Sequence, residues 1–180
     1  SDATAAAKKA GPPNSKGRVD LQSLPLITID DEDARDFDDA VWATRDSDSN
    51  NQGGWKLTVA IADVAAYVKP DDPIDREAKR RGNSVYMPRL VVPMLPEALC
   101  NEWCSLKPKE TRACLAVHIW IDHNGSILRY RFERALMQSV ARLTYTAVQT
   151  AHEGTTNKTT GPLLGAIEEL YGAYASLRKA

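Results

Sequence analysis

The sequence predicts an α+β fold with a mixed or antiparallel β-sheet core, peripheral helices and a helical C-terminal third. Strand-like apolar segments dominate the first two-thirds of the 180 residues, and a strong hairpin signal lies among them. In the last third, apolar residues follow helical spacing instead. A hydrophobic content of 43% and a charged content of 26% are ordinary for a globular domain.

The strand predictions come from apolar runs bounded by turn residues. Residues 55–64 alternate and then become continuously apolar, which indicates a largely buried strand. They follow a polar loop at 46–54, so a hairpin with the segment before that loop is expected. Residues 113–121 and 126–134 flank an Asp-His-Asn-Gly turn and predict a second hairpin. Prolines interrupt residues 84–96, which predicts an extended loop there.

Helices are predicted where apolar residues recur at helical spacing and capping residues flank them. Residues 74–81 suit a short helix that ends at Gly82. Thr144 is a suitable N-cap for a helix that runs to about His152. Residues 163–177 carry apolar side chains along one face, which indicates a longer helix packed on the core.

Composition restricts the domain organisation and the cellular location. Residues 1–18 have little to bury and are expected to form a flexible arm with a tag remnant, while residues 19–180 form the folded unit. The formal net charge of −1 argues against a uniformly basic nucleic-acid surface. No apolar run reaches the roughly 20 residues that span a membrane. Three cysteines give no complete disulfide framework, so a reducing, cytoplasmic location is expected.

The most informative segment is an acidic stretch framed by apolar residues. Residues 28–40 contain seven carboxylates and one fixed positive charge, Arg35. Carboxylates at such spacing repel one another, so they need either open water or a cation of high charge density between them. The apolar segments on both sides favour the cation. Oxygen ligands of this kind suit hard divalent ions, above all Mg²⁺, with Mn²⁺ as a possible substitute.

The spacing within this stretch allows several carboxylates to meet. A strand that ends at Ile29 projects the next side chain from its tip, and extended backbone around Phe37 turns that ring away as an anchor while its neighbours point together. The acids expected to converge are Asp30, Asp36, Asp38 and Asp39. Around Mg²⁺ they can activate water and offset phosphate charge, as in metal-assisted phosphoryl transfer. The alternative is an acidic turn that only keeps the surface soluble, the role expected of the acids at 31–33.

The order of residue types goes beyond a generic acidic run. The acidic segment reads Thr28-Ile29-Asp30, then Asp33-Ala34-Arg35-Asp36-Phe37-Asp38-Asp39-Ala40-Val41. Further blocks follow in order between about residues 17 and 150, including 17–21, 59–64, 84–88, 92–96 and 141–145. Together these blocks resemble the RNB catalytic domain of the ribonuclease II/ribonuclease R family, with the ribonuclease R branch most similar.

The resemblance implies a 3′-to-5′ exoribonuclease that hydrolyses RNA processively, depends on Mg²⁺ and releases nucleoside 5′-monophosphates. Its partner would be the 3′ end of single-stranded RNA, with no membrane involved. Residues 19–180 would be the N-terminal part of a truncated catalytic domain. The family's later Arg-rich segment and its flanking OB-type RNA-binding modules are absent, so the chain alone is expected to be inactive or impaired. A non-catalytic RNA-binding or regulatory protein on the RNB framework is the alternative, and the presence of all four aspartates argues against it.

The resemblance also implies roles for single residues. By position, Asp30, Asp36, Asp38 and Asp39 match the family's four active-site aspartates. Asp30 and Asp39 are expected to be direct metal ligands, Asp38 is expected to be most essential for the chemical step, and Asp36 is expected to support metal or substrate positioning. Tyr86 matches the aromatic residue that packs on the 3′-terminal nucleotide, a contact that tolerates any base.

Overall fold

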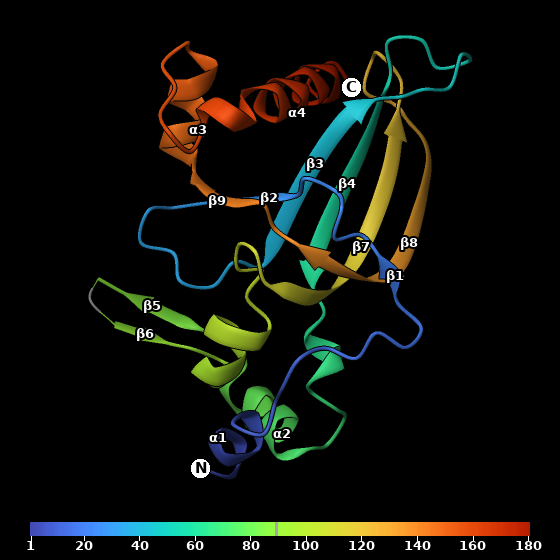
Figure 1. Cartoon of the computed structure of the whole chain (residues 1–180). Helices are drawn as coiled ribbons and strands as arrows, with labels where there is room; N and C mark the ends of the chain where they lie inside the picture. The colour runs from blue at the N-terminus through green and yellow to red at the C-terminus, as the bar shows by residue number, and fades with distance from the viewer. Residues whose placement is uncertain (89) are drawn as a thin grey trace.

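A seven-stranded mixed sheet forms the centre of the computed structural model, which describes residues 1–88 and 90–180 (Figure 1). The strand order is β1-β8-β7-β4-β3-β2-β9. The strands are β1 (Val19–Asp20), β2 (Ile27–Asp30), β3 (Asp39–Arg45), β4 (Trp55–Ala62), β7 (Thr111–Ile121), β8 (Ile127–Gln138) and β9 (Ala141–Thr144). The four central pairings are antiparallel, and β1 and β9 join the edges in parallel. The predicted α+β class with a mixed sheet is confirmed.

Both predicted hairpins are present. β3 and β4 pair along their length, with Asp39 opposite Ile61. β7 and β8 form the longest pair, and the turn between them is held by the Asp122 carboxylate, which accepts backbone N–H groups of Asn124 and Ser126. Gly125 in this turn has φ of +88°, and a Cβ there would overlap the backbone of α4, so only glycine fits.

The helices begin and end at the residue types that favour helix termini. They are α1 (Asp2–Ala7), α2 (Pro73–Arg81), α3 (Tyr145–His152) and α4 (Leu164–Leu177), with short turns η1 (Val64–Ala66), η2 (Leu99–Trp103) and η3 (Gly161–Leu163). The Asp72 carboxylate accepts the first free N–H groups of α2, and Thr144 does the same for α3. None of the helices among the described residues is both long and apolar enough to cross a membrane.

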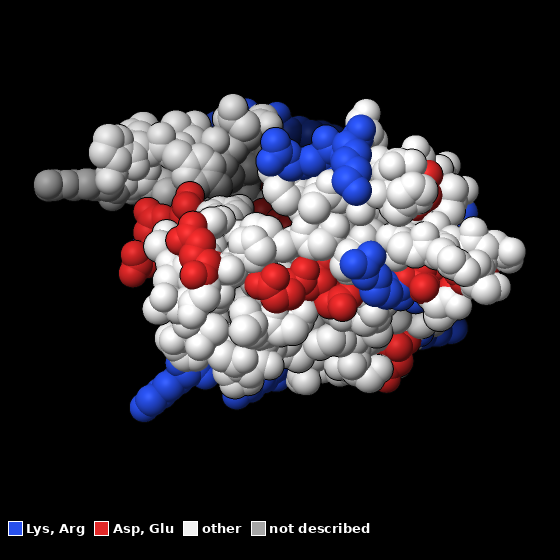
Figure 2. All heavy atoms as spheres, turned by 90° about the horizontal axis from the view of Figure 1, so that it is seen from above, with Lys and Arg blue, Asp and Glu red and all other residues white. Residues whose placement is uncertain are grey.

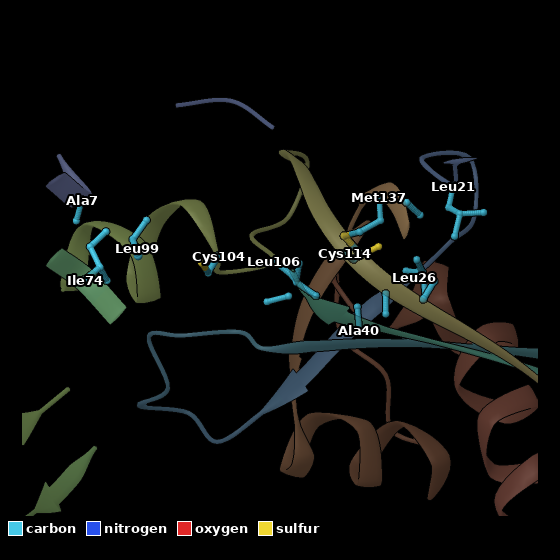
Figure 3. Close-up of a cluster of buried hydrophobic side chains, with 14 of the residues drawn as sticks. Ala7, Leu21, Leu26, Ala40, Ile74, Leu99, Cys104, Leu106, Cys114 and Met137 are labelled. Atoms are coloured by element: carbon cyan, nitrogen blue, oxygen red, sulfur yellow. The ribbon is translucent and has the colours of Figure 1, made fainter. Parts of the chain in front are cut away.

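Two layers of apolar side chains cover the sheet. On one face, α3 and α4 pack over Ile27 and Leu143 with Val148 and Ile167. A larger cluster, which includes Met137, extends away from the sheet toward α1 and α2 (Figure 3). Each fully buried Leu or Ile side chain contributes about 1.5–3 kcal/mol. The two layers therefore hold the sheet rigid, while the loop between β2 and β3 lies at the end of these strands.

The structure differs from the predicted flexible arm at residues 1–18. Residues 2–7 form helix α1, whose Ala3 and Ala7 are buried in the larger cluster beside Ile74 and Leu99. Alanine favours helix strongly, and its small side chain allows close approach to α2. Composition alone suggested that this segment had nothing to bury, because the partner surface comes from residues about 70 positions later.

The Pro-rich segment also differs from the predicted loop. Here β5 (Val85–Met87) and β6 (Leu90–Val92) pair as a two-stranded antiparallel hairpin, in which Tyr86 pairs with Val91. The hairpin stands apart from the main sheet (Figure 1). The prolines flank the two strands, where the missing N–H removes no ladder hydrogen bond.

Gly172→Ala should destabilise the protein by about 1–3 kcal/mol, because a Cβ at this position of α4 would overlap the Trp55 ring. That ring is pinned by its own hydrogen bond from Nε1 to Ser176 Oγ, 3.2 Å long. Gly165→Ala is the matched control in the same helix. A Cβ added there would meet no other part of the described chain within 4 Å, apart from its neighbours and its own helix backbone. It should stabilise by up to about 1 kcal/mol. Urea denaturation measures both, and equal effects would contradict the packing of α4 on Trp55.

Arg18→Ala should cost about 3–5 kcal/mol, because it leaves the buried Asp63 carboxylate without its cation. The two side chains are 9% and 7% exposed, and Arg18 Nη2 lies 2.6 Å from Asp63 Oδ2. Lys79→Ala removes an exposed pair with Asp75 and should cost less than about 1 kcal/mol. Thermal unfolding of the two variants tests the difference, and similar losses would contradict it.

Candidate active site

The acidic loop joins two neighbouring strands at one end of the sheet. β2 ends at Asp30 and β3 begins at Asp39. The strands are antiparallel, with Ile27 opposite Val41, so the residues that flank the loop lie at the same edge. The fold therefore brings the first and last of the four predicted acids to one end of the sheet (Figure 1).

Phe37 anchors the loop, as predicted. Its N–H donates to Ser105 Oγ at 3.0 Å, and its carbonyl accepts the N–H of Leu106 at 2.8 Å. The ring is half-buried against the larger apolar cluster. The next carbonyl, of Asp38, accepts the N–H of Ala62 at 2.9 Å. The acids on either side of Phe37 are thus attached to a fixed point of the core.

The carboxylates of the loop influence one another electrostatically. Partial burial raises the pKa of Asp30, the charges of Asp39, Asp38 and Asp36 raise it further, and the guanidinium of Arg142 lowers it. Desolvation also raises the pKa of Asp38, followed by the charges of Asp36 and Asp39. Asp38 is exposed as a residue, so this desolvation is incomplete. The charges of the other predicted acids therefore act on Asp30 and Asp38, whose ionisation they disfavour.

The acids share this end of the sheet without forming a closed ligand set. Among residues 1–88 and 90–180, no three His, Cys, Asp or Glu side chains are arranged to hold a metal ion. Repulsion between like charges favours such spreading. The residues nevertheless fit a hard cation in their chemistry, because every donor is a carboxylate oxygen. Asp30 Oδ2 is buried and has no hydrogen-bond partner in the described part of the chain, which leaves it open to a ligand.

Tyr86 lies beside the acidic loop although it belongs to the separate hairpin. Its side chain is largely exposed, at 68% of the residue's surface. The charge of Asp36 is the main cause that raises the pKa of its hydroxyl, followed by desolvation and by Asp38. The hairpin therefore presents an exposed aromatic ring within electrostatic range of Asp36 and Asp38.

The sequence interpretation missed one residue of this site, Arg142. It lies on β9 directly beside Thr28 of β2, and its Nη2 donates to the carbonyls of Asp31 and Glu32. Its guanidinium also lies 5.6 Å from the centre of the Phe37 ring. The chain separates Arg142 from the loop by about 110 residues, so only the parallel pairing of β2 with β9 reveals the contact.

Acidic and basic side chains alternate on the surface seen from above in Figure 1. Figure 2 views the structure from above, where acidic side chains form a band with basic side chains on both sides of it. Neither sign of charge covers this end, in keeping with the net charge of −1.

Residues 18–180 match the RNB domain family. The chain belongs to the RNB family. Ribonuclease R of Vibrio parahaemolyticus is 50% identical over 166 residues, which cover 91% of this RNB chain and 19% of the relative. Ribonuclease R of Escherichia coli is 49% identical, and the matched residues are 91% of this chain and 20% of that relative. The solved structure of Mycoplasma genitalium RNase R with ribose-methylated single-stranded RNA superimposes with a TM-score of 0.88 and is 28% identical in sequence. The superposition covers 98% of this chain and 28% of the solved chain. The chain thus spans about a fifth of the length of these curated relatives.

Asp38→Asn should stabilise the metal-free RNB domain at pH 7. Folding raises the pKa of Asp38 above its ordinary value of 3.8. The stabilising contribution of its protonated form is complete below pH 3.8 and is lost as the pH rises through the folded-state pKa. Asparagine does not titrate, so the free energy of unfolding of Asp38→Asn should exceed that of the parent at pH 7. This difference should shrink as the pH falls and vanish near pH 4. Urea denaturation between pH 4 and pH 7 with a chelator measures it.

Glu77→Gln is the control with the opposite sign. Hydrogen bonds from Arg80 and Arg81 lower the pKa of Glu77 to about 2, so its ionised form stabilises the folded state at neutral pH. This variant should be less stable than the parent at pH 7. If Asp38→Asn were also less stable there, the strain attributed to the crowded acids would be disproved.

Proposed function

We propose that this RNB domain supplies the acidic part of the active site of a Mg²⁺-dependent 3′-to-5′ exoribonuclease. The observation that carries the proposal is the location of four aspartates in and beside one loop at one end of the sheet, where a buried oxygen of Asp30 has no hydrogen-bond partner within the described chain. Family membership supports RNA as the substrate, because the relatives are ribonucleases R. The structural relative solved with single-stranded RNA supports single-stranded RNA as the molecule bound, and we propose that its 3′ end enters the site.

Each acid has a role in this proposal. Asp30 and Asp39, at the ends of two rigid strands, would hold Mg²⁺ or Mn²⁺ directly. When bound, the ion offsets phosphate charge and lowers the pKa of water. Asp38, whose backbone is tied to β4, orients the attacking water toward the phosphorus. Asp36 positions the loop and the substrate between the metal ligands and the hairpin.

Tyr86 would bind the last nucleotide of the RNA. Its exposed ring stands next to Asp36 and Asp38, so a base stacked on it places its own phosphate close to the acids. Stacking tolerates every base, because each has a π-face, and contributes about 1–3 kcal/mol per base. One stacked nucleotide between the ring and the acids fits the release of nucleoside 5′-monophosphates and processive movement by single steps.

The activity belongs to a protein longer than this chain, since the curated relatives are about five times its length. In the proposal, the remaining part of the catalytic domain supplies cationic groups for the phosphate, and OB-type modules deliver single strands. The isolated 180-residue chain then binds the cation and hydrolyses RNA poorly or not at all. Its described cysteines, Cys100, Cys104 and Cys114, are free thiols, which supports a cytoplasmic location.

Asp38→Asn in a protein of the relatives' full length should lower the rate of monophosphate release by at least about 10³-fold, because the positioned water is lost while RNA still binds. Mg²⁺-dependent release of nucleotides from 3′-labelled single-stranded RNA measures the rate. Asp33→Asn is the control, since Asp33 is an exposed acid of the same loop, and its rate should stay within about twofold.

Retention of more than a tenth of the rate by Asp38→Asn would contradict its role. An unsubstituted full-length protein that binds RNA and releases no nucleotide would favour the non-catalytic RNA-binding alternative.

A further inference from the structure

Three unpartnered polar atoms gather on one face of two neighbouring strands. In the chain as described, five buried side-chain polar atoms have no hydrogen-bond partner, and three of them are Thr28 Oγ1, Asp30 Oδ2 and Arg142 Nε. Thr28 on β2 is in register with Arg142 on the parallel strand β9. Asp30 follows two residues later, so its side chain points to the same side of the sheet. Unsatisfied buried atoms are rare, and three at one place point to a site.

Arg142 holds the acidic loop at both of its ends. Its Nη2 lies 2.6 Å from the carbonyl of Asp31 and 2.8 Å from that of Glu32, at the start of the loop. At the other end its guanidinium faces the ring of Phe37, which separates Asp36 from Asp38. Both hydrogen bonds come from one nitrogen, Nη2, while the planar guanidinium lies over the Phe37 ring. A lysine ammonium can donate hydrogen bonds to carbonyls, but it has no planar group to place over the ring.

We propose that Arg142 is a positioning residue, which holds the backbone of the acidic loop so that its carboxylates can close around the cation. The inference rests on the proposed function of these acids. The contacts of Arg142 go to backbone carbonyls, and its Nε remains without a partner among the described residues. It therefore fixes the path of the loop without neutralising a carboxylate by direct pairing.

The direction in which Mn²⁺ affinity changes in Arg142 variants separates a positioning role from a purely electrostatic role. Arg142 is a positive charge close enough to lower the pKa of Asp30, so by charge alone it opposes a bound cation. Its removal would then tighten metal binding, and Arg142→Lys would leave binding unchanged. A positioning role predicts the reverse. Arg142→Ala should weaken Mn²⁺ binding about 10–100-fold, as for partners that orient metal ligands. Arg142→Lys should also weaken it, because the planar group over Phe37 is lost and the shorter ammonium cannot contact the two carbonyls and the ring together.

The test uses the 180-residue chain with two independent readouts. Isothermal titration with Mn²⁺ gives the affinity of the parent, of Arg142→Ala and Arg142→Lys, and of Asp30→Asn/Asp39→Asn as the reference without ligands. Amide hydrogen exchange in the absence of metal follows Ala34 and Phe37, whose N–H groups bond Asp31 O and Ser105 Oγ. In both Arg142 variants these amides should exchange at least about tenfold faster.

Arg129→Ala is the matched control, because it removes an exposed arginine near the start of β8, where it pairs with Trp120 of β7. It should change neither the Mn²⁺ affinity nor the exchange of the loop. Circular dichroism verifies the folding of every variant, and Arg142→Lys retains the test if Arg142→Ala fails to fold.

Unchanged or tighter Mn²⁺ binding by Arg142→Ala, together with unchanged loop exchange, would overturn the inference. If the parent chain binds no Mn²⁺, the proposed metal site fails. The exchange rates then decide the role of Arg142 by themselves, with faster exchange in its variants supporting it and equal exchange refuting it.

Discussion

Crowding of like charges at the end of β2 and β3 is the constraint on which this site depends. Asp30 and Asp39 are fixed by strands that pair with each other, so the fold cannot relieve their repulsion by moving either one far. Partial burial adds to the cost of ionising Asp30 and Asp38. A divalent cation offsets both effects at once, which gives the acids a physical reason to lie together.

The packed core on both faces of the sheet forms a rigid frame around the crowded acids of the loop between β2 and β3. α3 and α4 close one face of the sheet, with the Trp55 ring packed against Gly172. The larger apolar cluster closes the other side and provides Ser105 and Leu106, which hold the backbone of Phe37. Sites built on such elements keep their geometry better than sites on free loops. The stability lost at the acids is therefore supplied by packing elsewhere, as expected for a functional site.

Arg142 and Tyr86 show how segments distant along the chain complete the loop. Arg142 reaches it because β9 pairs in parallel with β2, and Tyr86 because its hairpin lies near Asp36. One fixes the backbone of the loop, and the other offers an exposed ring beside it. Strand pairing and the separate hairpin thus bring a cationic and an aromatic side chain to the same acidic loop.

The sequence by itself determined the sheet class, both hairpins, the helices capped by Asp72 and Thr144, and the acidic loop between two strands, because these depend on local spacing and residue type. Only the tertiary structure decided that α1 packs against α2, that β5 and β6 pair, and that Arg142 holds the acidic loop. Each of those depends on surfaces far apart in the chain, whose meeting follows from strand pairing and burial and leaves no local pattern in the sequence.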